Sequence, residues 1–173
     1  MIAQNRLKGV GFLGREDAIN YGVTGPSGRG SGWACDVRKR SPYAAYDKVQ
    51  FDEVLYNEGD SYARYMVRMK EIEQSLHILE QLVDNIPEGD YLAKTKPIIK
   101  VPEGRYFKEV EAARGAFGIY LESRGDKFPY RLKVNSPGFN LVGAVDHMTR
   151  GSKIADLIAI GGSLDYVVPD IDR

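Results

Sequence analysis

At 173 residues the chain is long enough for one domain, or for one domain with a long arm. Lysine and arginine total 24, as do aspartate and glutamate, so the net charge is zero and predicts neither nucleic acid nor an anionic membrane as a partner. No run approaches the roughly 18 apolar residues of a membrane-spanning helix, so contact with a membrane is expected only through partners. A single cysteine, Cys35, excludes an internal disulfide framework and a cysteine-based zinc or iron–sulfur site.

Residues 1–58 are predicted to form a glycine-rich N-terminal segment followed by an extended one. Eight glycines lie within residues 9–32, a density that indicates positive φ angles or close backbone approach. One short helix is expected over Arg15–Tyr21, where Gly22 supplies the C-terminal stop. Residues 35–57 are expected to be extended and irregular.

Residues 59–87 are predicted to form one long helix. Asp60 or Ser61 can cap its start, and Pro87 ends it. At 1.5 Å per residue it would be about 40 Å long, which suggests a helix packed within a larger bundle. The prediction rests on apolar residues at spacings of three and four, as in an amphipathic helix: Tyr62, Tyr65, Met66, Met69, Ile72, Leu76, Leu79, Val83 and Ile86.

Residues 104–135 are predicted to form a small antiparallel sheet. The runs RYFKEVEA, AFGIYLES and PYRLKV are rich in strand-forming residues, and turn sequences containing Gly115 and Gly125 separate them. In the last run Tyr130, Leu132 and Val134 alternate with charged residues, so one face of this strand is expected to be buried.

Residues 138–173 are predicted to contain helices and a buried tail. The helices are expected at about 140–149 and 152–161, with Gly161-Gly162 ending the second. The whole chain, residues 1–173, is therefore assigned to the α+β class as a single unit.

Isolated motifs give little support for catalysis. GVGFLG at residues 9–14 fits G-x-G-x-x-G, but the preceding MIAQNRL is at best a weak strand and no βαβ pattern follows, so dinucleotide binding is not favoured. His77 is expected on the polar face of the long helix, and His147 near a helix end. Cys35 has no base partner in the sequence pattern.

Glu111 and Arg114 are expected to be neighbours at a tight turn. Two interpretations are open: a surface ion pair worth under about 1 kcal/mol, or a buried arginine that a carboxylate positions near a redox centre.

Three stretches together resemble one protein family: GVGFLGREDAINYGVTGPSGRGSGWACDVRK, VEAARGAFGIYLESRGDKFPYRLKVNSPGF and KIADLIAIGGSLDYVVPDIDR. In length and order they are similar to the C-terminal part of the D subunit of respiratory complex I, NADH-quinone oxidoreductase. Its mitochondrial homologue is the 49-kilodalton subunit. Because this family is related to the large subunit of nickel–iron hydrogenases, the resemblance implies a fragment of the hydrogenase large-subunit-like fold.

The resemblance also gives an interpretation of the acidic residues in the apolar C-terminal stretch. Hydrogenase large subunits end in D-P-C-x-x-C, whose cysteines bind nickel and iron. Here Asp165 keeps the aspartate, Tyr166 replaces the proline, and Val167 and Asp170 stand at the two cysteine positions. The resemblance thus implies a converted site that binds no metal, since the thiolates are gone, on a tail folded into the subunit interior.

The function implied by the resemblance belongs to a complex. The chain would form part of the quinone chamber beside the terminal iron–sulfur cluster, which lies in the neighbouring subunit, in an enzyme that couples electron transfer from NADH to quinone with proton pumping. Family positions near quinone and cluster map to Arg114, Asp165, Val167, Asp170 and Arg173. No catalytic residue and no cofactor of its own are expected. The implied partners are quinone and other complex I subunits, in the peripheral arm on the cytoplasmic side of the bacterial inner membrane.

The resemblance covers less than half of the family subunit. The chain alone is therefore not expected to reduce quinone, and its 60–86 helix is expected to expose apolar surface or to self-associate. The family pattern E-A-P-K/R-G-E is altered at residues 111–116. Two alternatives remain: a non-catalytic interaction or scaffold domain, and a subunit of a membrane-bound hydrogenase-type complex, which would need four cysteines.

Overall fold

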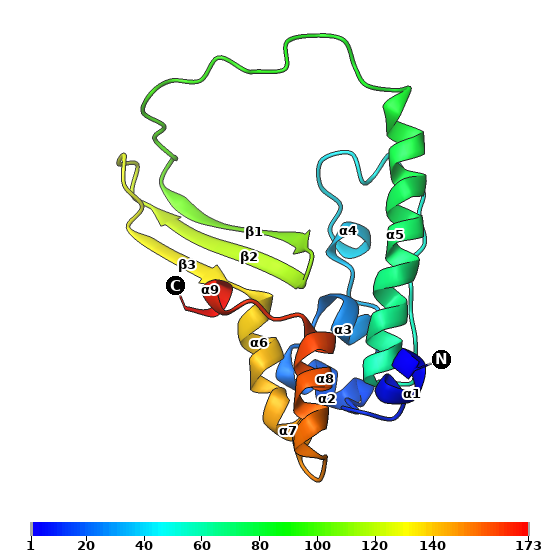
Figure 1. The fold of residues 1–173 in the computed structure, drawn as a ribbon. Coiled ribbons are helices and arrows are strands. Elements are labelled where there is room, and N and C mark those ends of the chain that lie inside the picture. Colours follow the sequence, from blue (N-terminus) through cyan, green and yellow to red (C-terminus); the bar gives the residue numbers. More distant parts are fainter. Residues whose placement is uncertain (1, 173) are drawn as a thin grey trace.

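The computed structural model describes residues 2–172, in which helices gather at one end of a small sheet (Figure 1). This mixture agrees with the predicted α+β class, while the hydrogenase-like fold remains a prediction. In chain order the elements are α1 (Ile2–Leu7), α2 (Arg15–Tyr21), α3 (Gly25–Arg29), α4 (Val37–Arg40), α5 (Ser61–Val83), β1 (Gly104–Ala112), β2 (Gly115–Ser123), β3 (Arg131–Asn135), α6 (Pro137–Gly143), α7 (Val145–Thr149), α8 (Ile154–Leu164) and α9 (Val168–Ile171).

The sheet has the strand order β1-β2-β3, and both pairs are antiparallel, as the three predicted runs require. Helix α4 packs beside β1, and α6 follows directly after β3 (Figure 1). The predicted buried face of the last strand is wrong for Tyr130 and Leu132, which are 56% and 55% exposed. The Arg124 guanidinium lies over the Tyr130 ring, yet both side chains remain more than half exposed.

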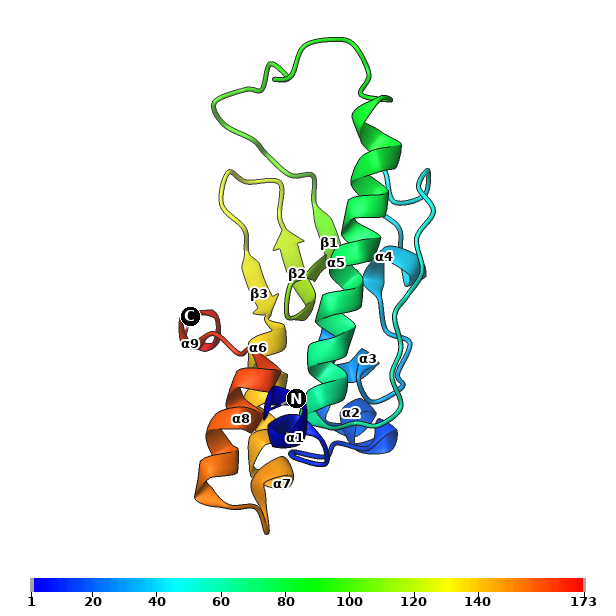
Figure 2. The same ribbon diagram turned by 45° about the vertical axis from the view of Figure 1, so that its right-hand side comes forward.

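Helix α5 begins at the predicted cap, because the Asp60 carboxylate accepts a hydrogen bond from the backbone N–H of Ala63 at 2.7 Å. It ends at Val83, earlier than predicted, and residues 84–103 arch from there to β1 (Figure 2). One face of the helix, with Ala63, Val67 and Ile78, is buried. Much of its remaining apolar surface is exposed, as predicted for a helix without its neighbours.

The main core lies between the N-terminal segment and the C-terminal helices. It brings residues from α2 and the flanking loops against α6, α7 and α8, and its buried members are Leu13, Ala18, Val23, Leu141, Ala144, Met148, Ile160 and Leu164. A smaller cluster of Val49, Phe51 and Ile78 joins the extended segment to α5.

Several predicted boundaries are corrected. MIAQNRL contains helix α1 where a weak strand was considered, and the predicted helix 140–149 is two helices, α6 and α7, meeting at Ala144. Helix α8 continues through Gly161-Gly162 to Leu164, because Leu164 is fully buried in the core and Ser163 bonds the Ile160 carbonyl. The short helix α3 lies in the glycine-rich segment, and α4 lies in the segment expected to be extended and irregular.

Candidate functional site

The tip of the β1–β2 hairpin is fixed on the N-terminal segment. Ala112 pairs with Gly115, which leaves Ala113 and Arg114 as the turn. Gly25 has φ +68°, and a Cβ there would lie 2.5 Å from the Gly115 Cα, so only glycine permits this backbone approach. Gly25, which is distant from Arg114 in the sequence, therefore helps to fix the position of Arg114.

Arg114 contacts Asp165, and both are residues singled out by the resemblance. The Arg114 Nε lies 3.1 Å from the Asp165 Oδ2 and donates to the Asp165 backbone carbonyl at 3.1 Å. Asp165 is the C-cap of α8 and has φ +58°, the left-handed region that non-glycine residues seldom occupy. A cation at a helix C-terminus also interacts favourably with the helix dipole. Both side chains are about 40% exposed, so the pair itself stabilises the fold by under about 1 kcal/mol.

A cavity of about 240 Å³ adjoins this ion pair. Arg114, Val167 and Asp170 line it together with Ala112, Ala113, Phe117 and Pro137. The Ser136 hydroxyl donates a hydrogen bond to the Asp170 carboxylate, which holds α9 against the start of α6. Arg114, Asp165, Val167 and Asp170 therefore converge at one place, whereas Arg173 lies outside the described residues.

The tail is less buried than predicted. Tyr166 and Val168 are 37% and 64% exposed, and no residue of α9 is buried. Figure 1 shows α9 beside α6, near the end of β3. Burial of the tail within the intact subunit therefore stays a prediction.

Arg68 on α5 is a neighbour of this site that sequence reasoning missed. Its Nη2 donates to the Leu164 carbonyl at 3.3 Å, and its Nε is buried without a partner among the described residues. Burial lowers the pKa of Arg68, and the nearby Asp165 carboxylate opposes that shift. A second guanidinium therefore lies close to the Asp165 end of α8. The helix periodicity alone could not have found it, because its role depends on a contact with a residue 96 positions away.

Glu111 does not pair with Arg114. Successive strand residues point to opposite faces of the sheet, and Glu111 lies on the face toward α4. Its Oε1 lies 2.7 Å from the Arg29 Nη1, and its Oε2 accepts from the backbone N–H of Val37 at 3.0 Å. Both predicted forms of a Glu111–Arg114 pair, a surface ion pair and a buried arginine positioned by Glu111, are therefore wrong, because Glu111 pairs with Arg29 and Arg114 with Asp165.

The Glu111–Arg29 pair belongs to a buried charged network that includes Asp36, Arg38 and Glu71. Burial opposes charge throughout it. Burial by itself would lower the pKa of Arg29, but the carboxylates of Glu111 and Glu71 raise it. For Glu111, burial raises the pKa by more than the nearby Arg29 lowers it, so the pKa of Glu111 is raised. Arg38 and Arg29 lower the pKa of Asp36 despite its burial. The network joins α3, α4, α5 and β1 beneath the hairpin that carries Arg114.

The structure also shows the surroundings of the two histidines and the cysteine considered in the sequence. His77 is exposed near Glu80, and the His147 Nε2 lies 3.4 Å from the Asp17 Oδ2, a partner not predicted. Burial raises the pKa of Cys35 to about 12, so its thiol is protonated and unreactive at neutral pH. Among residues 2–172, no group of three or more His, Cys, Asp or Glu side chains could hold a metal ion.

GVGFLG follows helix α1 and not a strand, so the dinucleotide pattern lacks its structural context. Carbonyls of this segment bond within the chain. Buried Arg64 donates to the Gly11 carbonyl at 2.8 Å, and the Ser61 hydroxyl donates to the Val10 carbonyl at 2.9 Å. The segment serves here to join α5 to the N-terminal core.

Comparison with known proteins decides the family. The family model described as "Respiratory-chain NADH dehydrogenase, 49 Kd subunit" matches residues 1–100 and 93–173, which together span the chain. The chain belongs to this family. It is 68% identical over its full length to the NADH-quinone oxidoreductase C/D subunit of Bacteroides fragilis and 67% identical to that of Phocaeicola vulgatus. It is 53% identical to the NADH-quinone oxidoreductase D subunit of Desulfotalea psychrophila.

The chain is shorter than these relatives. It spans 33% of the C/D subunits and 47% of the D subunit. Among residues 2–172, no helix combines the length and apolar character that crossing a bilayer requires.

Proposed function

We propose that this chain forms part of the wall of a quinone chamber in an NADH-quinone oxidoreductase, beside the terminal iron–sulfur cluster of a neighbouring subunit. The chain binds no cofactor of its own in this proposal. Its complex passes electrons from NADH to quinone, coupled to proton pumping, in the peripheral arm on the cytoplasmic side of the bacterial inner membrane. The enzymatic activity is that of the assembled complex.

The convergence of Arg114, Val167 and Asp170 on one cavity, with Asp165 beside it, carries the proposal. The family resemblance assigns these positions to the quinone and cluster region, although Arg114 and Asp165 stand 51 residues apart in the chain. The cavity is small and mostly apolar, with one cationic and one acidic side chain at its edge. Such a surface suits one side of an apolar ring that carries polar oxygens.

The chemistry available at the cavity is binding and electrostatic stabilisation. Arg114 has five N–H donors, and its Nε and Nη2 bond Asp165, which leaves donors for a quinone oxygen. Quinone takes up two electrons and two protons to become quinol, and a fixed guanidinium stabilises the negative charge that electron uptake creates. Asp165 holds the orientation of Arg114.

The experiment uses the full C/D subunit of Bacteroides fragilis in which this chain replaces the matching segment, assembled in its complex. Arg114→Met is expected to lower the quinone-dependent rate and to raise the KM for quinone. Oxidation of NADH by a soluble artificial acceptor should be unchanged.

Arg124→Met is the matched control, because Arg124 is exposed on the β2–β3 loop over the Tyr130 ring. It should leave both activities unchanged. Quinone kinetics of Arg114→Met that equal those of Arg124→Met would contradict the proposal.

A further inference from the structure

The strand that leads to Arg114 is tied to the N-terminal segment by one buried side chain. The Glu111 Oε1 lies 2.7 Å from the Arg29 Nη1, and the Glu111 Oε2 accepts from the backbone N–H of Val37 at 3.0 Å. The side chains of Glu111 and Arg29 are buried, so the bond between them is stronger than it would be in water. Because Arg114 follows Glu111 by three residues, in the turn that ends this strand, the position of Glu111 limits where Arg114 can lie.

Arg29 bridges two carboxylates on different elements. Its Nη1 donates to Glu111 of β1, while its Nε donates to the Glu71 Oε1 on α5 at 2.6 Å. A guanidinium holds its N–H donors in one rigid plane, so two carboxylates bound to different nitrogens have a fixed separation. This Glu111–Arg29–Glu71 contact, the carboxylate bridge, therefore sets the distance between the hairpin and α5.

Helix α5 also holds the other partner of the Arg114–Asp165 pair. Arg68 lies three residues before Glu71, on a neighbouring position of the helix surface. It donates to the Leu164 carbonyl, which directly precedes Asp165. Because a helix is rigid over one turn, the carboxylate bridge and Arg68 together determine how the two charges of the pair meet.

We propose that Glu111 is a positioning residue for the quinone reaction, acting through the carboxylate bridge to hold Arg114 where it meets both Asp165 and quinone. The inference rests on the proposed function. Glu111 is not among the side chains that line the cavity beside Arg114, so its effect on quinone is indirect. A guanidinium stabilises a reacting group only while its donors stay aligned, and a displacement of about 1 Å can lower a rate about a hundredfold.

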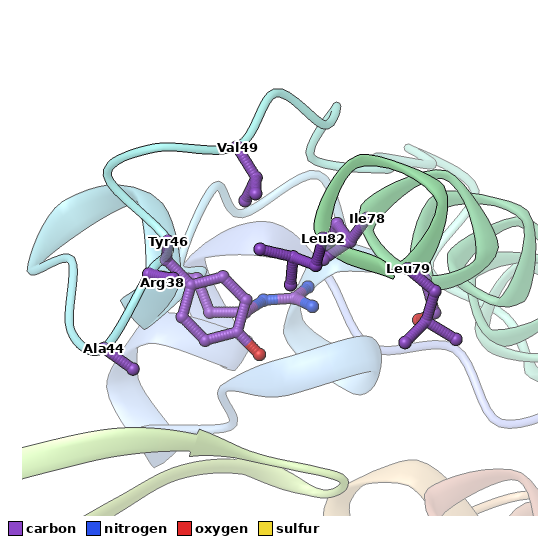
Figure 3. A pocket seen from close by; sticks show the side chains of 9 residues that line it. Arg38, Ala44, Tyr46, Val49, Ile78, Leu79 and Leu82 are labelled. Atoms are coloured by element: carbon purple, nitrogen blue, oxygen red, sulfur yellow. The ribbon is translucent and has the colours of Figure 1, made fainter. Parts of the chain in front are cut away.

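A second branch of the charged network supplies a matched control. Asp36 and Arg38 form a bidentate pair, and within residues 2–172 neither bonds to the hairpin. Asp36 lies 3.9 Å from the Arg29 Nη1, beyond hydrogen-bond distance. Arg38 lines a cavity of about 410 Å³ between α5 and the segment after α4 (Figure 3). Asp36→Asn therefore removes a buried carboxylate charge, as Glu111→Gln does, while the hairpin keeps its contacts.

Glu111→Gln breaks one of the two contacts that Glu111 makes. A carboxylate accepts at both oxygens, whereas an amide offers one acceptor and one NH2 donor. Glutamine must therefore turn its NH2 toward either the Arg29 guanidinium or the Val37 N–H, where donor meets donor.

The quinone KM is measured in the complex assembled with the full Bacteroides fragilis C/D subunit that carries this chain as its matching segment. Glu111→Gln should raise this KM at least about threefold. Oxidation of NADH by a soluble artificial acceptor should be unchanged. Asp36→Asn should leave both activities unchanged.

A double-mutant cycle separates positioning from a general structural effect. If Glu111 acts through Arg114, adding Glu111→Gln to Arg114→Met should change the quinone KM by less than about twofold, because the guanidinium to be positioned is already gone. A general weakening of the fold would instead raise the KM by the same factor in both backgrounds.

Glu71→Ala tests the carboxylate bridge from its other end, and does so even if Glu111→Gln fails to assemble. The Glu71 side chain is 18% exposed and Arg29 keeps Glu111 as a partner, so the fold should tolerate this change. The matched control is Glu73→Ala on the same helix, because the Glu73 side chain is 63% exposed and pairs with Lys70. Of these two variants, only Glu71→Ala should raise the quinone KM.

Three outcomes would overturn the inference. Where Arg114→Met raises the quinone KM, the positioning role alone fails if Glu111→Gln and Glu71→Ala match their controls. It also fails alone if Glu111→Gln raises the KM equally in both backgrounds. An unchanged quinone KM in Arg114→Met would instead overturn the proposed quinone site, and the positioning role with it.

Discussion

Asp36 stabilises the fold through a buried carboxylate, and Asp36→Asn tests this role. The Asp36 side chain is fully buried, its Oδ2 lies 2.6 Å from the Arg38 Nη2, and its Oδ1 accepts from the backbone N–H of Arg38 as the N-cap of α4. Breaking a buried ion pair by removing one charge costs about 3–5 kcal/mol. Asparagine keeps the cap, and Arg38 is 14% exposed, so the expected loss of unfolding free energy is about 2–3 kcal/mol.

The assay is urea unfolding followed by circular dichroism at pH 7. With a urea dependence of about 1–3 kcal/mol per molar, the midpoint for Asp36→Asn should fall by about 1–2 M. The matched control is Asp146→Asn, because the Asp146–Arg150 pair is more than three-quarters exposed and should contribute under about 1 kcal/mol.

The pH dependence has a definite sign. The folded state lowers the pKa of Asp36, so its stabilisation is present above the ordinary pKa near 3.8 and is lost as the pH falls through the lower, folded value. The difference between wild type and Asp36→Asn should therefore shrink in acid. An Asp36→Asn variant as stable at pH 7 as Asp146→Asn would refute this account of the network.

Three further predictions concern the backbone at Gly25, the thiol of Cys35 and the helix cap at Asp165. Gly25→Ala should lower the unfolding free energy by about 2–4 kcal/mol, because φ is +68° and a Cβ would strike the hairpin backbone. Gly162→Ala, in a helix with open space around it, should instead be neutral or stabilising by up to about 1 kcal/mol, and similar melting temperatures for the two would count against the close approach. Wild type should lose about 1–2 kcal/mol more than Cys35→Ala between pH 7 and pH 10, since the raised pKa of the folded thiol makes its stabilisation fade above the unfolded value near 9. If wild type and Cys35→Ala lost equal unfolding free energy between these two pH values, this prediction would be wrong. Asp165→Gly should be nearly neutral, because relief of the left-handed strain offsets the lost ion pair, whereas Asp165→Ala keeps the strain and should cost about 1 kcal/mol. Calorimetry of both variants decides, and equal losses would exclude the strain.

The sequence predicts the elements whose signals are local. Helix α5, the three strands and α2 with its Gly22 stop carry periodicity, capping or turn residues within their own segments. Helices α3 and α4 have five and four residues and no apolar period, so apart from the Asp36 cap of α4 their support comes mainly from tertiary contacts. Helix α8 extends past its predicted end at Gly161-Gly162 because burial of Leu164 outweighs the helix-breaking tendency of two glycines.

The candidate site was predicted from the resemblance and not from spacing. Nothing local in the sequence links Arg114 to Asp165, and local reasoning paired Arg114 with Glu111 instead. The true partner of Glu111, Arg29, is 82 residues away. Ion pairs of this kind depend on how the hairpin sits on the N-terminal segment, which the glycine contacts determine and the residue pattern does not reveal.

The proposed quinone chamber is tested most directly by photolabelling. An azido-quinone would be activated in the complex assembled with the full C/D subunit that contains this chain, and the labelled peptides mapped. The proposal predicts label on the hairpin residues 112–117 or the tail residues 165–170, and loss of that label when excess quinone competes. Competable label found only elsewhere in the complex would contradict it.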